Sequence, residues 1–301
     1  MTSRRNVLGG AAALAAVASL PGRTRAGEPI MRTVPATGEQ MPVIGMGSWI
    51  TFNVGDDEER RAQRAEVLRA FFACGGTVID SSPMYGSSEE VIGWGLARLG
   101  KQPVFAATKV WTPLAMLGPR QMEQSRELWG VERFDLMQIH NMLAWEGHLE
   151  TLLEDKQADR IRLIGMTTSH GRRHEEFAAA MSRQPLDAVQ FSYSIADREA
   201  ERELLPLAAE RGMAVLINRP FDGGLLFDVV DGRPLPAWAA EIDCANWAQL
   251  FLKFVISHPA VTCAIPATSR VDHMQENMGA LSGRLPDPDL RERMARHVLE
   301  L

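Results

Sequence analysis

Cysteine is scarce in this sequence of 301 residues, and after the N-terminal segment the chain contains no cluster of Lys or Arg. The three cysteines, Cys74, Cys244 and Cys263, lie far apart without a CxxC spacing. We therefore expect buried free thiols rather than a disulfide scaffold. The formal net charge is -6, and without a basic cluster we expect no nucleic-acid partner. The body also lacks any apolar run of membrane-spanning length.

The N-terminal segment differs in composition from the rest of the chain. It reads MTSRRNVLGGAAALAAVASLPGRTRA, with Arg4 and Arg5 before an Ala-rich run that is too short to span a bilayer. The letters SRRNVL resemble the twin-arginine export motif. We predict a signal peptide over 1–26, cleaved near Ala26, and a single domain over 27–301. The expected location is the periplasm, with no stable membrane association after cleavage; the alternative is an N-terminal helix on a cytoplasmic protein.

From residue 31 onward, short apolar stretches alternate with amphipathic stretches of helix length. Residues 31–44 first predict a hairpin that turns at Thr37 and Gly38. The expected strands cover residues 43–46, 77–80, 104–108, 134–140, 161–166, 188–191, 214–217 and 261–265. The expected helices cover residues 58–74, 88–99, 120–129, 146–158, 172–182, 199–211, 245–258 and 271–281.

This alternation predicts an α/β fold, a (β/α)8 TIM barrel with the hairpin as an N-terminal plug. Several expected strands are continuous apolar runs, as is usual when both faces of a strand are covered. A doubly wound open sheet is the alternative. It would normally carry GxGxxG after the first strand, where this chain has GMGSW.

Chemically matched side chains follow three adjacent expected strands. The second strand ends at Asp80, with Tyr85 in the loop beyond it; the third ends at Lys109 and the fourth at His140. The carboxyl ends of barrel strands meet at one mouth. We therefore expect these four side chains to lie together.

The four groups suit proton donation to a carbonyl oxygen. An unperturbed phenol has a pKa near ~10, and a neighbouring ammonium is expected to lower it. Lys109 can be that ammonium, Asp80 can hold it in place, and His140 can donate a hydrogen bond to the substrate. None of the four supplies a hydride, so a cofactor is required.

With these four residues and the segments around them, the chain resembles the aldo-keto reductase superfamily. The resemblance spans about residues 31–282 and rests on VIGMGSW, VIDSSPMYGSSEEVIG, FAATKV, FDLMQIH, IRLIGMTT, VQFSYS, FDGGLL and AIPATSRVDHMQEN. It implies a barrel enzyme that reduces small aldehydes or ketones with NADPH, or catalyses the reverse oxidation. NADH is a possible cofactor in place of NADPH.

The resemblance also implies a set of cofactor contacts. They are Gly47, Ser48, Trp49, Thr167, Thr168, Gln190, Asn218, Arg219, Gly224, Leu225, Thr268, Arg270, Glu276 and Asn277. A planar guanidinium at position 270 would suit the 2′-phosphate of NADPH. The family usually has an Arg or Lys where this chain has His273, which weakens the case for a strong NADP preference.

Two other departures affect the nicotinamide end of the cofactor. Thr167 and Thr168 stand where the family usually has Ser-Asn, so one side-chain amide is lost. The family's Tyr-Ser-Pro-Leu is replaced by Asn-Arg-Pro-Phe from position 218. The ring that stacks on the nicotinamide is therefore missing, unless Phe221 or Tyr193 takes its place.

Other side chains after the strands are candidates for lining a substrate pocket. They are Trp49, Met84, Trp111, Asn141 and Phe221, for which ordinary loop packing is the alternative. The loops are short and no long tail follows the last expected helix, which indicates an open pocket for small carbonyl compounds.

The histidines outside the predicted active site have a structural interpretation. His170 and His174 have the spacing of a helical metal pair, but without a third ligand we expect a solvated helix end and no metal. His148, His258 and His297 are expected at the surface or at helix caps.

Three functions stay open on the sequence. The first is a carbonyl reductase with Tyr85 as proton donor. The second is a nicotinamide-nucleotide-binding sensor or regulatory protein with little turnover. The third is a barrel aldolase or lyase that uses Lys109 as a Schiff base, which would leave Tyr85 without a purpose.

Overall fold

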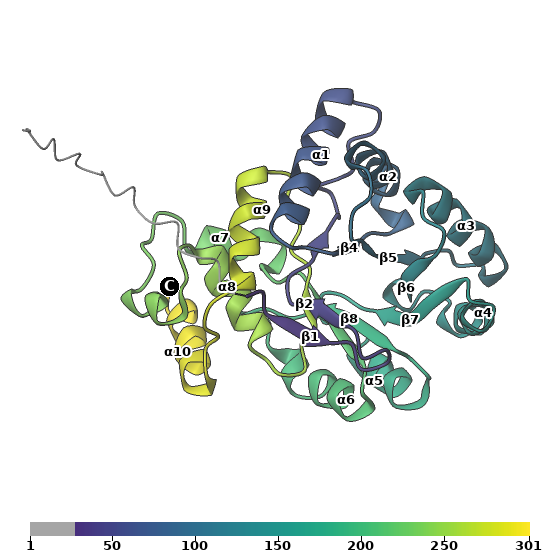
Figure 1. The fold of residues 1–301 in the computed structure, drawn as a ribbon. Helices are drawn as coiled ribbons and strands as arrows, with labels where there is room; N and C mark the ends of the chain where they lie inside the picture. Colours follow the sequence, from purple (N-terminus) through teal and green to yellow (C-terminus); the bar gives the residue numbers. More distant parts are fainter. Residues whose placement is uncertain (1–27) are drawn as a thin grey trace, which may run out of the picture.

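The computed structural model describes residues 28–301, so the expected signal peptide lies outside the described residues. Eight parallel strands form one sheet in the order β3 to β10 (Figure 1). Bridges from Ile44 to Ala264 and from Gly47 to Ala267 join the two ends of this sheet. The predicted barrel is therefore confirmed. The strands are β3 (Met46–Gly47), β4 (Val78–Asp80), β5 (Phe105–Val110), β6 (Phe134–Ile139), β7 (Ile161–Thr167), β8 (Ala188–Ser192), β9 (Ala214–Asn218) and β10 (Cys263–Ala264).

The hairpin closes one end of the barrel, as predicted. Strands β1 (Met31–Thr33) and β2 (Gln40–Pro42) pair antiparallel and lie across the middle of the view in Figure 1. Val34 and Met41 are buried in an interior cluster with apolar strand residues such as Leu136. The end of the barrel that the hairpin covers is thus packed with apolar side chains. The polar groups lie at the opposite end.

Helices ring the outside of the barrel (Figure 1). Those that follow strands are α1 (Glu58–Ala73), α2 (Ser88–Leu99), α3 (Gly118–Trp129), α4 (Trp145–Gln157), α5 (His174–Arg183), α6 (Leu204–Arg211), α8 (Trp247–Ile256) and α9 (Val271–Met278). Side-chain caps fix several helix starts: Asp57 accepts a hydrogen bond from the Arg60 amide at 3.0 Å, and Asn246 accepts one from Gln249 at 2.9 Å. These caps satisfy amides that have no partner within the helix.

Three expected helices are shorter than predicted because the chain turns inside them. Glu203 has φ -140, so α6 begins only after it. Arg173 has φ 54, so α5 starts at His174. Beyond α9 the chain continues as a 3-10 turn, Gly279–Leu281. Hydrophobic periodicity runs through such turns and does not reveal them.

Two helices were missed in the sequence. The short α7 (Leu225–Val229) follows β9, and α10 (Pro288–Leu299) ends the chain. The expectation that the chain ends soon after α9 was therefore wrong. A signal for α10 was present, because Asp287 caps the Leu290 amide at 2.8 Å and Pro288 occupies the first helical position.

The structure also corrects two expectations about buried side chains. Cys74 is exposed and Cys244 partly so, and only Cys263 is a buried thiol. His148 is buried, not at the surface, and its Nε2 is 2.8 Å from the Thr112 carbonyl oxygen.

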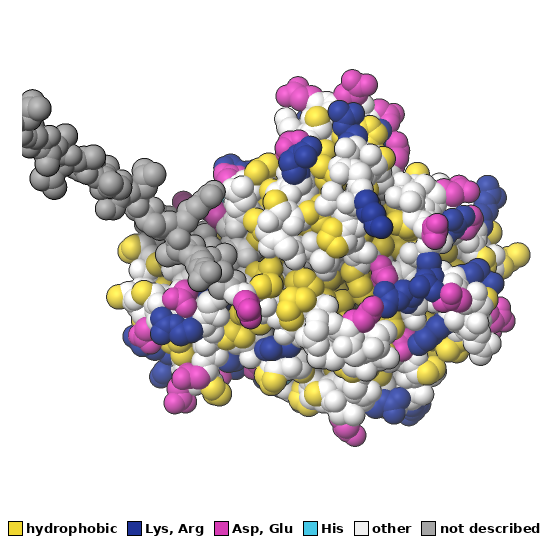
Figure 2. Space-filling view, in the orientation of Figure 1, with side chains coloured by type: hydrophobic (Ala, Val, Ile, Leu, Met, Phe, Trp, Pro, Cys, Tyr) yellow, Lys and Arg dark blue, Asp and Glu magenta, His cyan; other side chains and the backbone are white. Residues whose placement is uncertain are grey.

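The outer surface carries charges of both signs. On the face in Figure 2, Lys and Arg are interspersed with Asp and Glu around a centre of hydrophobic side chains. Among residues 28–301, no helix combines the length and the hydropathy that crossing a bilayer requires.

Arg291 anchors α10 to the barrel. Its guanidinium donates to Tyr193 Oη at 2.6 Å, Ser257 Oγ at 2.5 Å and Glu201 Oε1 at 2.9 Å. It also donates to the Phe254 carbonyl, and Tyr193 donates to Glu201. Removing the guanidinium would leave the Phe254 carbonyl without this donor beneath the helix, whereas Glu201 would keep its hydrogen bonds from Arg198 and Tyr193.

We expect Arg291→Met to lower the free energy of unfolding by about 1–3 kcal/mol, the range for leaving a buried hydrogen-bonding group without its partner. Arg293→Met is the matched control in the same helix, because Arg293 is half exposed and 3.9 Å from Glu241. It should change stability by about 0.5 kcal/mol or less. Urea unfolding followed by tryptophan fluorescence measures both variants. Equal effects would contradict the anchoring role.

Candidate active site

A cavity of about 530 Å³ opens at the carboxyl end of the barrel. The side chains that line it come from the ends of several strands and from the loops that follow them. They include Asp80, Tyr85 and His140 beside Gly47 and Gln190. Gly47 is required by the barrel closure, because a Cβ there would lie 2.8 Å from the Ile265 carbonyl oxygen.

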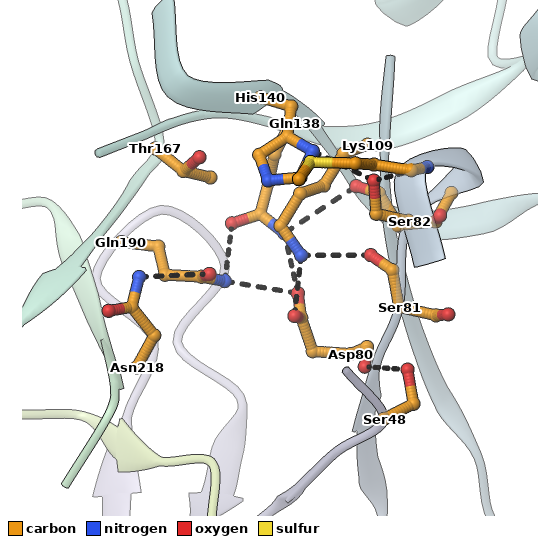
Figure 3. A network of polar contacts seen from close by, with 12 residues as sticks. Ser48, Asp80, Ser81, Ser82, Lys109, Gln138, His140, Thr167, Gln190 and Asn218 are labelled. Atoms are coloured by element: carbon orange, nitrogen blue, oxygen red, sulfur yellow. Dashed lines mark hydrogen bonds and ion pairs between the residues drawn. The ribbon is translucent and has the colours of Figure 1, made fainter. Parts of the chain in front are cut away.

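A buried ion pair lies at the base of this cavity (Figure 3). Lys109 Nζ donates to Asp80 Oδ2 at 2.5 Å and to the Ser81 carbonyl at 2.8 Å. The other oxygen of Asp80 accepts from Gln138 Nε2 at 2.8 Å and from Gln190 Nε2 at 3.0 Å. Lys109 is fully buried and Asp80 is 2% exposed. The carboxylate is thus held by side chains from β5, β6 and β8.

Tyr85 lies over the ammonium of this pair. The Lys109 Nζ atom is 5.2 Å from the centre of the Tyr85 ring. Burial would lower the pKa of Lys109, but attraction to Asp80 and Tyr85 outweighs burial and raises it. The lysine therefore stays charged beside the phenol.

The expected lowering of the Tyr85 pKa is corrected by the structure. Burial raises the pKa of the phenol more than the Lys109 charge lowers it, and Asp80 raises it further. Because burial is the largest of these effects and raises the pKa, the phenol keeps its proton at neutral pH. A protonated phenol is the form that can donate a proton to a carbonyl.

His140 completes the group of four as a neutral imidazole. Its ring meets the Tyr85 ring edge to face, with centres 5.6 Å apart. Burial, and then the Lys109 charge, lower its pKa to about 3. A neutral imidazole can donate a hydrogen bond without carrying charge into the cavity. The structure thus brings together the four residues expected to do the chemistry.

The expected cofactor contacts fall into two groups. One group lines the cavity: Gly47, Ser48, Trp49, Thr167, Gln190, Asn218, Arg219 and Gly224. Gly224 has φ +106, and a Cβ at this position would meet open space. The cavity lining therefore extends from Asp80, Tyr85 and His140 past the ends of β8 and β9 to an open glycine turn.

The second group lies outside the cavity lining. Thr168 is buried and donates from its hydroxyl to the Arg172 carbonyl at 2.6 Å, and Leu225 is exposed at the start of α7. The remaining four residues lie at or within α9: Thr268, Arg270, Glu276 and Asn277. Ala267, which lines the cavity, directly precedes Thr268 in the chain. Amides at a helix N-terminus favour a phosphate.

The missing stacking ring is not replaced by Tyr193. That side chain is fully buried and packs on Phe254 and His258. Phe221 does line the cavity, with 9% of its surface exposed. Asn218 accepts from Ser192 Oγ at 2.7 Å and donates to the Thr168 carbonyl at 3.0 Å.

Four of the five expected substrate-pocket residues lie at the edge of the cavity. Trp49, Met84, Asn141 and Phe221 border the cavity. Trp111 does not, and its backbone is held by two hydrogen bonds to the Gln121 side chain, at 2.6 and 2.9 Å. Trp111 remains partly exposed above β5.

The sequence interpretation missed Gln138 and Ser82. Gln138 lies two residues before His140 within the expected strand 134–140, so the alternation of side chains indicated that both point the same way. In the structure β6 ends at Ile139 and His140 begins the 3-10 turn that follows it. Ser82 Oγ is 2.8 Å from His140 Nδ1. Its place two residues after Asp80 gave no such signal, because Ser82 caps a 3-10 turn beyond the strand.

His170 and His174 have different neighbours in the structure. His174 Nδ1 lies 3.6 Å from Glu199, and His170 lines the cavity next to Ser169. Within the part of the chain that the structure describes, no three His, Cys, Asp or Glu side chains converge as metal ligands.

Comparisons with known proteins point to one family. The model of the Aldo/keto reductase family matches residues 43–294. Methylglyoxal reductase YeaE of Escherichia coli is 26% identical over 257 residues, covering 83% of this chain and 89% of the relative. The NADH-specific methylglyoxal reductase of Escherichia coli is 25% identical over 306 residues, covering 82% and 91%.

Solved structures give the same result. An aldo/keto reductase from Klebsiella pneumoniae in complex with NADP and acetate superposes with a TM-score of 0.71 at 25% identity. The match covers 87% of this chain and 93% of that structure. A Klebsiella pneumoniae aldo-keto reductase in complex with NADPH also gives a TM-score of 0.71 at 25% identity, covering 89% and 95%.

Proposed function

This chain belongs to the aldo/keto reductase family, and we propose that Tyr85 is the proton donor when it reduces a small aldehyde or ketone. It is an oxidoreductase that acts on carbonyl or alcohol groups with NADP. The observation that carries the proposal is the Tyr85 ring over the charged, fully buried Lys109. The resting phenol keeps its proton, and the ammonium beneath it stabilises the phenolate left after transfer.

Each of the four side chains has one task in this mechanism. NADPH, when bound, supplies the hydride to the carbonyl carbon. Tyr85 gives its proton to the carbonyl oxygen, and Lys109 stabilises the resulting phenolate. Asp80 holds Lys109 in place through the 2.5 Å contact. His140 orients the carbonyl by donating a hydrogen bond to the same oxygen.

The two other functions have less support. A Schiff-base lysine must lose its charge to attack a carbonyl, whereas Lys109 is paired to Asp80 and its pKa is raised. A sensor with little turnover is favoured only by the missing aromatic ring at Asn218. Oxidation of NADPH in the presence of a panel of small aldehydes distinguishes reductase from sensor.

Small carbonyl compounds are the proposed substrate class. Two of the relatives are named as methylglyoxal reductases. The cavity that His140 lines is also bordered by the apolar side chains Trp49, Met84 and Phe221. Such a lining suits a compact carbonyl compound held mainly by apolar contact.

Tyr85→Phe should lower kcat for aldehyde reduction by roughly 10²–10⁴-fold, the usual contribution of a general acid. NADPH affinity should stay within about threefold of the wild type, because the phenol is needed only in the transition state. Tyr193→Phe is the matched control at the other of the two tyrosines in the chain, and it should retain activity. Steady-state kinetics and fluorescence titration with NADPH measure these effects. Near-normal kcat in Tyr85→Phe would remove Tyr85 as the acid.

Arg270 is the proposed contact for the 2′-phosphate of NADPH. Its side chain is exposed and paired with Asp272 through an Nε–Oδ1 contact of 3.0 Å. The guanidinium can therefore exchange a carboxylate partner for a phosphate. The absence of a cation at His273, and a relative named as NADH-specific, leave NADH as a usable cofactor.

We expect Arg270→Ala to weaken NADPH binding by about 1–3 kcal/mol, the range for a hydrogen bond to a charged group, and to leave NADH binding nearly unchanged. Asp272→Ala should tighten NADPH binding, because it frees the guanidinium. Titration of both variants with both cofactors tests this. Equal losses for NADPH and NADH in Arg270→Ala would show that the arginine has another role.

We also propose that the protein is exported to the periplasm through the twin-arginine route. This proposal rests on SRRNVL and the apolar run after it in the first 26 residues. That route carries folded proteins, so a barrel that binds its cofactor in the cytoplasm would take it along. Bound cofactor would also stabilise the folded state by mass action.

The double variant Arg4→Lys, Arg5→Lys should accumulate as full-length precursor in the cytoplasm. Arg23→Lys, Arg25→Lys is the matched control within the same segment and should be exported normally. Cell fractionation with mass spectrometry of the N-terminus measures both. Processing of the Arg4→Lys, Arg5→Lys variant in the periplasm, or an unprocessed wild type in the cytoplasm, would contradict the proposal.

A further inference from the structure

Ser82 lies beneath the catalytic candidates and makes a hydrogen bond that the mechanism above does not use. Its Oγ is 2.8 Å from Nδ1 of His140 (Figure 3). Ser82 is fully buried, and His140 is 4% exposed. Water is therefore largely excluded from this contact, and the two side chains are each other's partners.

The hydrogen-bond pattern around Ser82 fixes the direction of this contact. The Met84 amide donates to Ser82 Oγ at 3.2 Å, so the oxygen already accepts one bond. A hydroxyl has one proton to donate. Within residues 28–301, His140 Nδ1 is the one acceptor in reach of that proton. If Nδ1 carried the proton instead, the buried Ser82 hydroxyl would have no acceptor, which is costly.

The direction of this bond selects one tautomer of the imidazole. Burial lowers the pKa of His140 to about 3, so the ring is neutral and carries a single N–H. When Nδ1 accepts from Ser82, that N–H must be on Nε2. Nε2 makes no hydrogen bond within the described chain, and His140 lines the cavity.

We propose that Ser82 is a positioning residue that holds His140 in the Nε2–H tautomer, so that the imidazole faces the substrate oxygen as a donor. Ser82 is fully buried outside the cavity lining, so it would act through His140. The opposite tautomer would turn a lone pair toward the carbonyl oxygen and repel it. The proposal rests on the proposed role of His140 in catalysis. The tautomer itself is a property of the resting protein and can be measured without substrate.

Nitrogen NMR of ¹⁵N-histidine-labelled protein measures the tautomer directly. Protonated and unprotonated imidazole nitrogens of a neutral ring have well-separated shifts. The chain has seven histidines, so the His140 signals are assigned as those lost in His140→Asn. In the wild type we expect a protonated Nε2 and an unprotonated Nδ1 at pH 7. A protonated Nδ1 would overturn the proposal.

The variant Ser82→Ala removes the hydroxyl. We expect the two His140 nitrogen shifts to move toward each other, because both tautomers become populated. We also expect kcat/KM for aldehyde reduction to fall roughly three- to tenfold, the factor that corresponds to one ordinary hydrogen bond. The dissociation constant for NADPH should not change.

Two further variants separate this role from a structural one. Ser82→Thr keeps the hydroxyl and should restore the wild-type nitrogen shifts. Ser81→Ala is the matched control, since Ser81 is the adjacent buried serine and its Oγ has no partner among the described residues. It should leave the His140 shifts unchanged.

The measurements distinguish a wrong role for Ser82 from a wrong proton donor. Wild-type shifts in Ser82→Ala, or a loss of kcat/KM with the tautomer unchanged, would overturn the role of Ser82. Full activity in Tyr85→Phe would overturn the proton donor but would leave the measured tautomer, and the dependence on Ser82, in place. The expected shifts with the expected fall in kcat/KM support both.

Discussion

The contact between Lys109 and Asp80 is the constraint on which the rest of the site depends. Burying either charge alone would cost several kcal/mol. The pair is stable because the lysine also donates to Ser81 and interacts with Tyr85, while the carboxylate also accepts from Gln138 and Gln190. These hydrogen bonds hold both charged side chains in place, and the raised pKa of Lys109 keeps it an ammonium beneath Tyr85.

The barrel makes such a pair possible by separating apolar from polar layers. The hairpin side chains Val34 and Met41 fill one end together with apolar strand residues. The opposite end carries the carboxylate, the ammonium and the two glutamines. Because parallel strands lie in fixed register, Lys109 is level with Gln138, and the polar layer needs no flexible loop to assemble it. Tyr85 and Ser82 come from the 3-10 turn that follows β4, and His140 begins the 3-10 turn directly after β6.

The sequence predicted what depends on strand order and strand ends. Eight apolar segments predicted the barrel, and their last residues predicted that Asp80, Lys109 and His140 converge, because the geometry of a parallel barrel leaves no other arrangement. The sequence did not predict local turns. Glu203 and Arg173 break helices through their own backbone angles, and α10 was missed although its cap was present.

The balance of opposing electrostatic effects could not be predicted from the sequence either. That Lys109 lies near Tyr85 follows from the fold, and proximity alone suggested a lowered phenol pKa. The sign depends on how deeply the phenol is buried and on how completely Asp80 neutralises the lysine, and both are properties of the packed structure. Burial prevails. This result suits the proposed role of Tyr85, because a phenol that keeps its proton can donate it to a carbonyl, and the Lys109 ammonium can then stabilise the phenolate.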